Sequence, residues 1–170
     1  MSITRSLQLL IVVVVAGACF VVIYRQTPTL ASQLLLNGGF EDGGLTPDQW
    51  QNIGGTLERV SSPDPNRGYS AALTSTSQTS KWIYQTVTVT AGNPYTLTAY
   101  ALKDNAEAAS VFLRIRFYDA AAEPLSEAGL DQPFPNSPEF QLLTLGPVTA
   151  PDRAVSARVM GVVNPRTEAA

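Results

Sequence analysis

The chain has 170 residues, of which 45% are hydrophobic and 15% are charged, so it can bury a core and is neither disordered nor collagen-like. It contains no histidine, which excludes every mechanism that uses imidazole as a base, a proton shuttle or a metal ligand. A net charge of −3 without a basic cluster argues against a nucleic-acid partner. The single cysteine, Cys19, lies in an apolar N-terminal segment, so the remainder has neither a disulfide nor a thiolate nucleophile.

The N-terminal segment Leu9–Tyr24 is a run of 16 apolar or small residues. Its length lies between that of a signal-peptide core, about 7 to 15 residues, and that of a membrane-spanning helix, about 17 to 25. We therefore predict one hydrophobic helix within 1–31, which either anchors the chain in a membrane or is removed by cleavage near Ala31. A lipoprotein cleavage box at Ala16–Cys19 is a weaker alternative. In each case residues 32–170 form an extracytoplasmic domain.

In the sequence after the leader, glycine and proline residues separate short apolar runs, which is typical of an all-β domain. Trp82–Thr90 and Tyr95–Leu102 alternate between apolar and polar residues, and the turn residues between them predict a hairpin. Ser110–Tyr118 alternates in the same way, with one apolar and one charged face. Further strands are expected at Leu34–Leu36, Thr56–Val60, Ala71–Thr74, Phe140–Leu145 and Ala154–Val163, and loops at Ser61–Arg67 and Glu127–Pro138. Such a series of short strands predicts a two-sheet sandwich or jelly roll.

Several motifs occur in a characteristic order: Leu36-Asn37-Gly38-Gly39-Phe40-Glu41 with Trp50, Gly68–Leu73, Tyr84–Leu97, Phe117–Asp119, and Phe140 with Thr149–Pro151. Together they resemble the carbohydrate-binding modules of families four and nine, over about Leu34 to Val163. The resemblance implies a jelly-roll sandwich of the galactose-binding-domain type, which usually serves as a non-catalytic module of secreted polysaccharide-degrading enzymes. The family's last strand is not recognised after Val163, so we expect either a sandwich that is one strand short or a fragment of a longer protein.

The polar face of the predicted strands collects aromatic rings and arginines, namely Trp82, Tyr84, Tyr100, Phe112, Arg114, Arg116, Tyr118 and Arg158. A ring can stack on the C–H face of a sugar, and a guanidinium can donate two hydrogen bonds to neighbouring hydroxyls or to a carboxylate. We therefore predict a glycan-binding site made of Trp82, Tyr84, Tyr100, Arg114, Arg116 and Arg158. The alternative is that the rings lie under a loop and that the arginines pair with acidic residues on neighbouring strands.

The resemblance also places Asn37 and Glu41 near a structural calcium site, although the closing aspartate of the family is absent. Two oxygen donors fall short of the six to eight ligands that calcium takes, and a solvated glutamate in a glycine-rich turn is the alternative. No cofactor is otherwise expected. Trp50 and Tyr95 are assigned to the core, and Asp119 is assigned to a turn.

These observations predict an exported, non-catalytic module that binds a polysaccharide or cell-wall glycan and has no nucleic-acid partner. An adhesion or structural β-sandwich, whose same face contacts protein, is the alternative. A glycoside hydrolase would need two carboxylates on either side of the scissile bond, and no such pair stands out among the 14 acidic residues.

Overall fold

The computed structural model describes residues 5–8, 33–65, 67–75, 77–103, 108–129 and 136–165, and this part of the chain contains strands but no helix. The predicted leader helix, Leu9–Tyr24, and the cleavage region near Ala31 lie outside the described residues. No helix that could span a membrane is found within the described ranges. The strands are β1 (Arg5–Gln8), β2 (Gln51–Ile53), β3 (Thr56–Ser61), β4 (Tyr69–Thr74), β5 (Lys81–Thr88), β6 (Pro94–Lys103), β7 (Ala108–Tyr118), β8 (Pro124–Gly129), β9 (Ser137–Thr149) and β10 (Ser156–Pro165).

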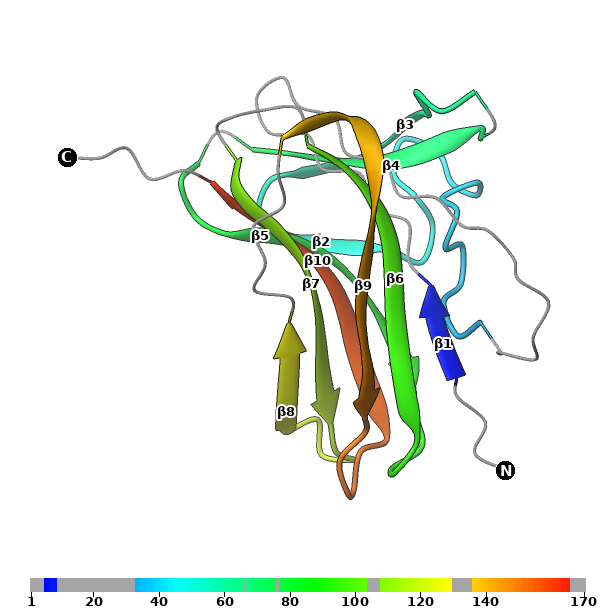
Figure 1. The fold of residues 1–170 in the computed structure, drawn as a ribbon, viewed down its shortest axis with the longest axis vertical. Coiled ribbons are helices and arrows are strands. Elements are labelled where there is room, and N and C mark those ends of the chain that lie inside the picture. The colour runs from blue at the N-terminus through cyan, green and yellow to red at the C-terminus, as the bar shows by residue number, and fades with distance from the viewer. Residues whose placement is uncertain are drawn as a thin grey trace.

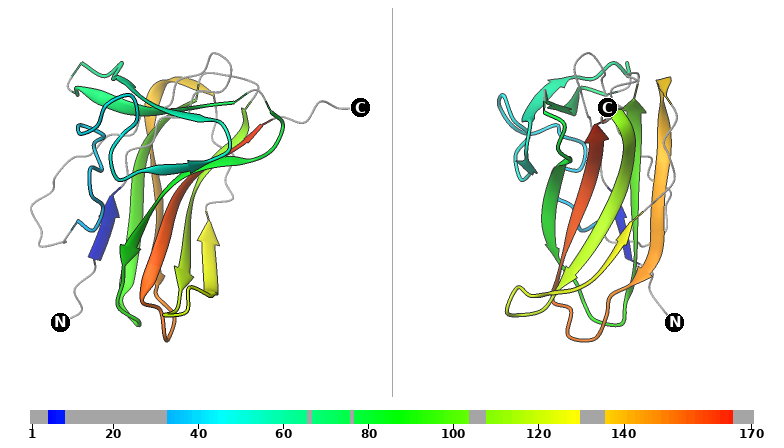
Figure 2. Two further views of the ribbon diagram at one scale, coloured as in Figure 1. Left: turned by 180° about the vertical axis from the view of Figure 1, so that it is seen from behind. Right: turned by 90° about the vertical axis from the view of Figure 1, so that its left-hand side faces the viewer.

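The strands form a β-sandwich, as predicted, with two layers that face each other (Figures 1 and 2). One layer is a five-stranded sheet in the order β2-β5-β10-β7-β8. In the other layer β6 pairs with β9 along most of its length and with β1 along its first residues only. A separate ribbon of β3 and β4 crosses one end of the molecule (Figure 1).

The chain changes layers between most consecutive strands, and this overturns the predicted hairpin of Trp82–Thr90 and Tyr95–Leu102. β5 pairs with β2 and β10, whereas β6 pairs with β1 and β9. The connection after β5 does not fold back on its own strand, because it hydrogen-bonds to the segment that links β9 to β10. Gly92 N donates to Ala150 O at 2.9 Å, and Ala150 N donates to Asn93 O at 2.9 Å. The turn residues were recognised correctly, but the turn carries the chain to the opposite sheet.

The core lies between the two layers and is built from the apolar side of each alternating strand. Ile83 of β5, Leu113 of β7 and Leu97 of β6 have no exposed surface. Tyr95 and Phe117 contact each other across the sandwich with ring centroids 6.4 Å apart. The core assignments of Trp50 and Tyr95 are confirmed by exposures of 6% and 0%. Burial of these side chains contributes about 1.5 to 3 kcal/mol each to stability.

The prediction of a strand at Leu34–Leu36 is wrong. The side chain of Gln85, and not a neighbouring strand, hydrogen-bonds to the backbone of Leu36. Gln85, buried on the inner side of β5, donates from Nε2 to Leu36 O at 2.9 Å and accepts from Leu36 N at 2.8 Å. Its Nε2 also donates to Gln49 O at 3.3 Å. The backbone of Leu36 is therefore satisfied without a ladder, and the chain turns directly afterwards.

The turn that follows explains much of the opening motif in structural terms. Asn37 adopts a left-handed backbone (φ 47°), and its Nδ2 donates to Asp42 O at 2.7 Å and Asp48 O at 2.9 Å. The Trp50 indole donates to Asn37 O at 3.0 Å, and its ring packs edge-on against the fully buried Phe40. Gly43 has φ 128°, and a Cβ atom there would lie 2.3 Å from Thr46 O, so only glycine fits.

Three short strands were not predicted. One is β1 (Arg5–Gln8), which pairs in parallel with β6. β2 pairs with one edge of β5 and β8 pairs with one edge of β7. The expected loop Glu127–Pro138 is therefore wrong for Glu127–Gly129, which belong to β8, and for Ser137–Pro138, which begin β9. The pattern of β8 is weak because it is short, begins at a proline and is largely exposed.

Candidate functional site

The candidate site is the outer face of the five-stranded sheet, the side that points away from the core. Pairing between strands sets its rows: Trp82, Val162 and Phe112 lie opposite one another, then Tyr84, Met160 and Arg114, then Thr86, Arg158 and Arg116. Glu127 of β8 extends the third row. We use the name outer face for these residues together with Tyr118. In the left view of Figure 2 the outer side of this sheet is toward the viewer, with the partner layer on its far side.

One half of the outer face is apolar. Phe112, Met160 and Val162 are 9%, 3% and 2% exposed, because the partly buried rings of Trp82 and Tyr84 pack against them. The Tyr84 hydroxyl donates to Gln51 Oε1 on the neighbouring strand β2. These rings are therefore held in place by packing and by a hydrogen bond, which lowers the entropy cost of stacking a ligand on them.

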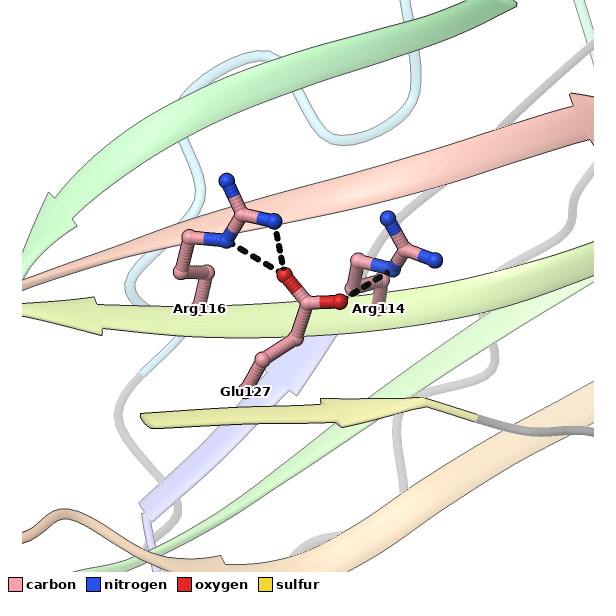
Figure 3. A network of polar contacts seen from close by, with 3 residues as sticks. All are labelled: Arg114, Arg116 and Glu127. Atoms are coloured by element: carbon pink, nitrogen blue, oxygen red, sulfur yellow. Dashed lines mark hydrogen bonds and ion pairs between the residues drawn. The ribbon is translucent and has the colours of Figure 1, made fainter. Parts of the chain in front are cut away.

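The other half of the outer face carries charge. Glu127 lies between two arginines of β7: its Oε1 is 2.9 Å from Arg114 Nε, and its Oε2 accepts from Nε and pairs with Nη2 of Arg116 (Figure 3). The hydrogen bond with Glu127 raises the pKa of Arg116, and Tyr118 adds a smaller contribution. The side chains of Arg114, Arg116 and Glu127 keep exposures of 29%, 40% and 31%. The pairing of Arg114 and Arg116 with an acidic residue on a neighbouring strand, which was part of the alternative to a glycan-binding site, is thus present.

Arg158 differs from its two neighbours on β7. Its guanidinium carbon lies 4.5 Å from the ring centroid of Tyr84 and 5.4 Å from that of Tyr118. Within the described residues, no carboxylate lies at ion-pair distance from Arg158, and its buried Nε has no hydrogen-bond acceptor. Two tyrosines therefore orient this cation, and part of its capacity to donate hydrogen bonds is unused.

The structure brings five of the six predicted site residues together, and the exception is Tyr100. Tyr100 lies on β6 in the opposite layer, faces Leu142 of β9, and packs partly against the main core. Alternation along β6 was predicted correctly, since Tyr95, Leu97 and Ala99 are buried and Thr98 and Tyr100 are less so. The error came from the assumed hairpin, which placed β6 beside β5.

The side chains of the two predicted calcium ligands, Asn37 and Glu41, contact different parts of the structure. Both polar atoms of the Asn37 side chain bind the loop backbone, since Oδ1 also accepts from Asp42 N at 3.0 Å. The exposed Glu41 lies instead beside Gly68. Among the described residues, no group of three or more Asp, Glu, His or Cys side chains could hold a metal ion. A calcium ion at this loop stays a prediction.

Asp119 is a turn residue, as predicted, because its Oδ1 accepts from Ala121 N at 2.9 Å and from Glu123 N at 3.0 Å. Sequence reasoning missed Glu127, Gln51 and Met160 as members of the site or its border. Met160 could have been placed from the alternation of β10, which puts it on the same side as Arg158. Glu127 gave no comparable signal, because its strand was assigned to a loop.

Comparison with known proteins supports the fold of this chain but does not assign it to a family. No known family and no curated protein matches the sequence. Among solved structures, the chain is similar to the enzymatically active domain of tailspike protein 4 from bacteriophage CBA120, with a TM-score of 0.61 and 18% sequence identity. The similarity covers 78% of this chain but only 19% of the tailspike chain. At this identity the comparison supports the β-sandwich fold alone.

Proposed function

We propose that this chain is a non-catalytic binding module that holds a polysaccharide or cell-wall glycan on the outer face. The proposal rests on one observation: the same side of the five-stranded sheet carries the rings of Trp82 and Tyr84 and the guanidinium groups of Arg114, Arg116 and Arg158. Rings that can stack on sugars lie beside guanidinium groups that can donate to hydroxyls or carboxylates.

The resemblance to carbohydrate-binding modules of families four and nine supports the same function and implies a jelly roll. The similar tailspike structure is described as enzymatically active, yet the region shared with this chain is a minor part of it. Glu127 is the only acidic residue in the five strands that carry the outer face, and two arginines neutralise it. Since glycoside hydrolysis uses two carboxylates, this face favours binding over cleavage. The proposal includes an extracytoplasmic location, which rests on the apolar segment Leu9–Tyr24.

The test is a glycan panel of β-glucans, xylans, mannans and polyuronates, presented to the full chain. We expect at least one polymer to bind with a Kd of about micromolar to millimolar, because a sheet face buries limited area. Trp82→Ala should weaken that binding by about 5- to 30-fold, since a stacking ring contributes on the order of 1 to 2 kcal/mol. Leu142→Ala is the matched control, because Leu142 is 55% exposed on the opposite layer.

A second candidate, contact with another protein, is favoured by the apolar half of the outer face, where Ile53 is 42% exposed beside the Trp82 row. Apolar surface of this kind is typical of the centre of protein interfaces. If no polymer of the panel is retained and Trp82→Ala lowers the melting temperature, glycan binding is wrong and the protein-contact function replaces it.

A further inference from the structure

The charged half of the outer face has more cations than the fold can pair. Arg158 lies directly opposite Arg116 on neighbouring strands, and Arg114 lies two residues along β7 on the same side. Like charges placed directly opposite each other on a sheet are destabilising. The five strands supply a single carboxylate, Glu127, which Arg114 and Arg116 share. Three guanidinium groups with one acid leave a local charge of about +2 on this face.

This local excess of positive charge does not reflect a positive net charge of the whole chain. The whole chain has 11 lysines and arginines against 14 acidic residues, and its net charge is −3. A cationic cluster on an acidic protein concentrates the favourable potential for anions at one place. The cluster also lies next to the rings of Tyr84 and Tyr118 rather than on a featureless surface.

Arg158 supplies the second, independent observation. It is the arginine of this face without a carboxylate partner among the described residues, and its Nε is buried without an acceptor. A buried donor without an acceptor lowers stability, and because this Nε is closed to solvent, donation to a ligand falls to the two Nη groups of Arg158. Because its guanidinium lies over two tyrosine rings, the direction in which it can donate is already restricted.

We propose that the ligand of the outer face is an anionic, carboxylated polysaccharide, a polymer that contains uronic acid residues. This inference rests on the proposed function and names its substrate class. Arg158 and Arg116 donate to the sugar carboxylates in the bidentate geometry that guanidinium groups favour, and Tyr84 and Trp82 pack against the sugar rings. Glu127 stands where a ligand carboxylate would lie, and it competes with the ligand for Arg114 and Arg116.

Because Glu127 competes with the ligand, we expect its substitution to raise the affinity for an acidic polysaccharide. Glu127→Gln keeps the side-chain size and the backbone pairing of β8 but removes the internal anion. We expect polygalacturonate to bind this variant about 3- to 10-fold more tightly than the original chain, because two guanidinium groups become available. Binding of a neutral glycan should not rise.

The experiment measures the affinity of the full chain for polygalacturonate, its methyl ester and dextran sulfate, at low and at physiological salt. We expect polygalacturonate to bind at least about 10-fold more tightly than the neutral ester and to weaken as salt increases. Arg158→Lys and Arg116→Lys should each weaken binding by roughly 5- to 10-fold, since lysine keeps the charge but loses the fork. Arg153→Lys is the matched control, because this side chain is 75% exposed in the turn before β10 and lies outside the outer face.

Three results would overturn the inference, and they differ from a failure of the proposed function. Equal binding of polygalacturonate and its ester, with Trp82→Ala weakening both, would leave a glycan module without a preference for acidic polymers. Equal binding of dextran sulfate combined with silent arginine-to-lysine variants would indicate non-specific ion exchange. Lower affinity of Glu127→Gln at an unchanged melting temperature would mean that Glu127 supports the site. If no glycan binds at all, the proposed function itself fails.

Discussion

Two arginines in different regions of this molecule lie over tyrosine rings, and the fold uses them differently. Arg59 of β3 lies over Tyr69, donates from Nε to Phe40 O at 2.8 Å and from Nη2 to Glu41 O at 2.6 Å. Arg158 of β10 lies over Tyr84 and Tyr118, but its buried Nε has no acceptor among the described residues. The first arginine fastens the opening loop to the β3–β4 ribbon. The second makes no such hydrogen bond from its Nε.

The same contrast separates the two regions as wholes. At the opening loop, the polar side chains of Asn37, in the loop, and of Gln85, on β5 beneath it, are occupied by backbone groups. On the outer face, three guanidinium groups share one carboxylate. Satisfied polar groups stabilise a fold, whereas polar groups with unused donors lower stability and are retained at binding sites. Mutations in the two regions should therefore affect different quantities.

The largest effect is expected for Gln85→Leu. The substitution keeps the volume roughly constant but removes both partners of the Leu36 backbone and one partner of Gln49. We expect the free energy of unfolding to fall by about 2 to 4 kcal/mol, because three part-buried hydrogen bonds are lost. Thermal melting, at roughly 4 °C per kcal/mol, measures this change. An unchanged melting temperature would show that water replaces the glutamine.

A smaller loss of stability is expected for Arg59→Ala, which removes two hydrogen bonds and the contact with Tyr69. The free energy of unfolding should fall by about 1.5 to 3 kcal/mol. Glycan affinity of the folded protein should stay the same, because Arg59 lies outside the outer face. A variant that keeps its stability but loses glycan binding would reverse the roles assigned to the two regions.

The smallest change of stability, and of opposite sign, is expected for Arg158→Met. Methionine covers the same rings without a buried unpaired donor and without the like charge of Arg116 opposite it. We expect the ligand-free protein to gain up to about 1 kcal/mol of stability while binding of polygalacturonate is lost. Melting curves with and without the polymer measure both quantities. Clear destabilisation without ligand would mean that Arg158 serves the fold, as Arg59 does.

Much of the fold was predictable because alternation along a strand depends on local sequence. Ile83 and Leu113 were placed on the inner side and Trp82 and Arg114 on the outer side, and the structure agrees. A one-residue shift would bury the arginine and expose the core, so the pattern specifies the register strongly.

Other elements could not be predicted because their cause lies far away in the sequence. Leu34–Leu36 has the composition of a strand, but the side chain of Gln85, 49 residues away from Leu36, satisfies its backbone. Tyr100 has the correct parity for its strand, but its strand lies in the other layer. The pairing of Glu127 with Arg114 and Arg116 depends on the edge strand β8, whose short sequence begins at a proline and has little strand character.

The sequence by itself determined an all-β chain, the inner and outer sides of β5, β7 and β10, and the chemistry of rings and arginines on their outer side. These properties follow from side-chain type and from the two-residue period of a strand. Tertiary structure alone decided which strands are neighbours: it joined Arg158 to Tyr84 and Tyr118, gave Glu127 to both arginines of β7, and removed Tyr100 from the site. The order of strands in a sandwich depends on how the two sheets pack over the whole core, and a short stretch of sequence does not contain this information.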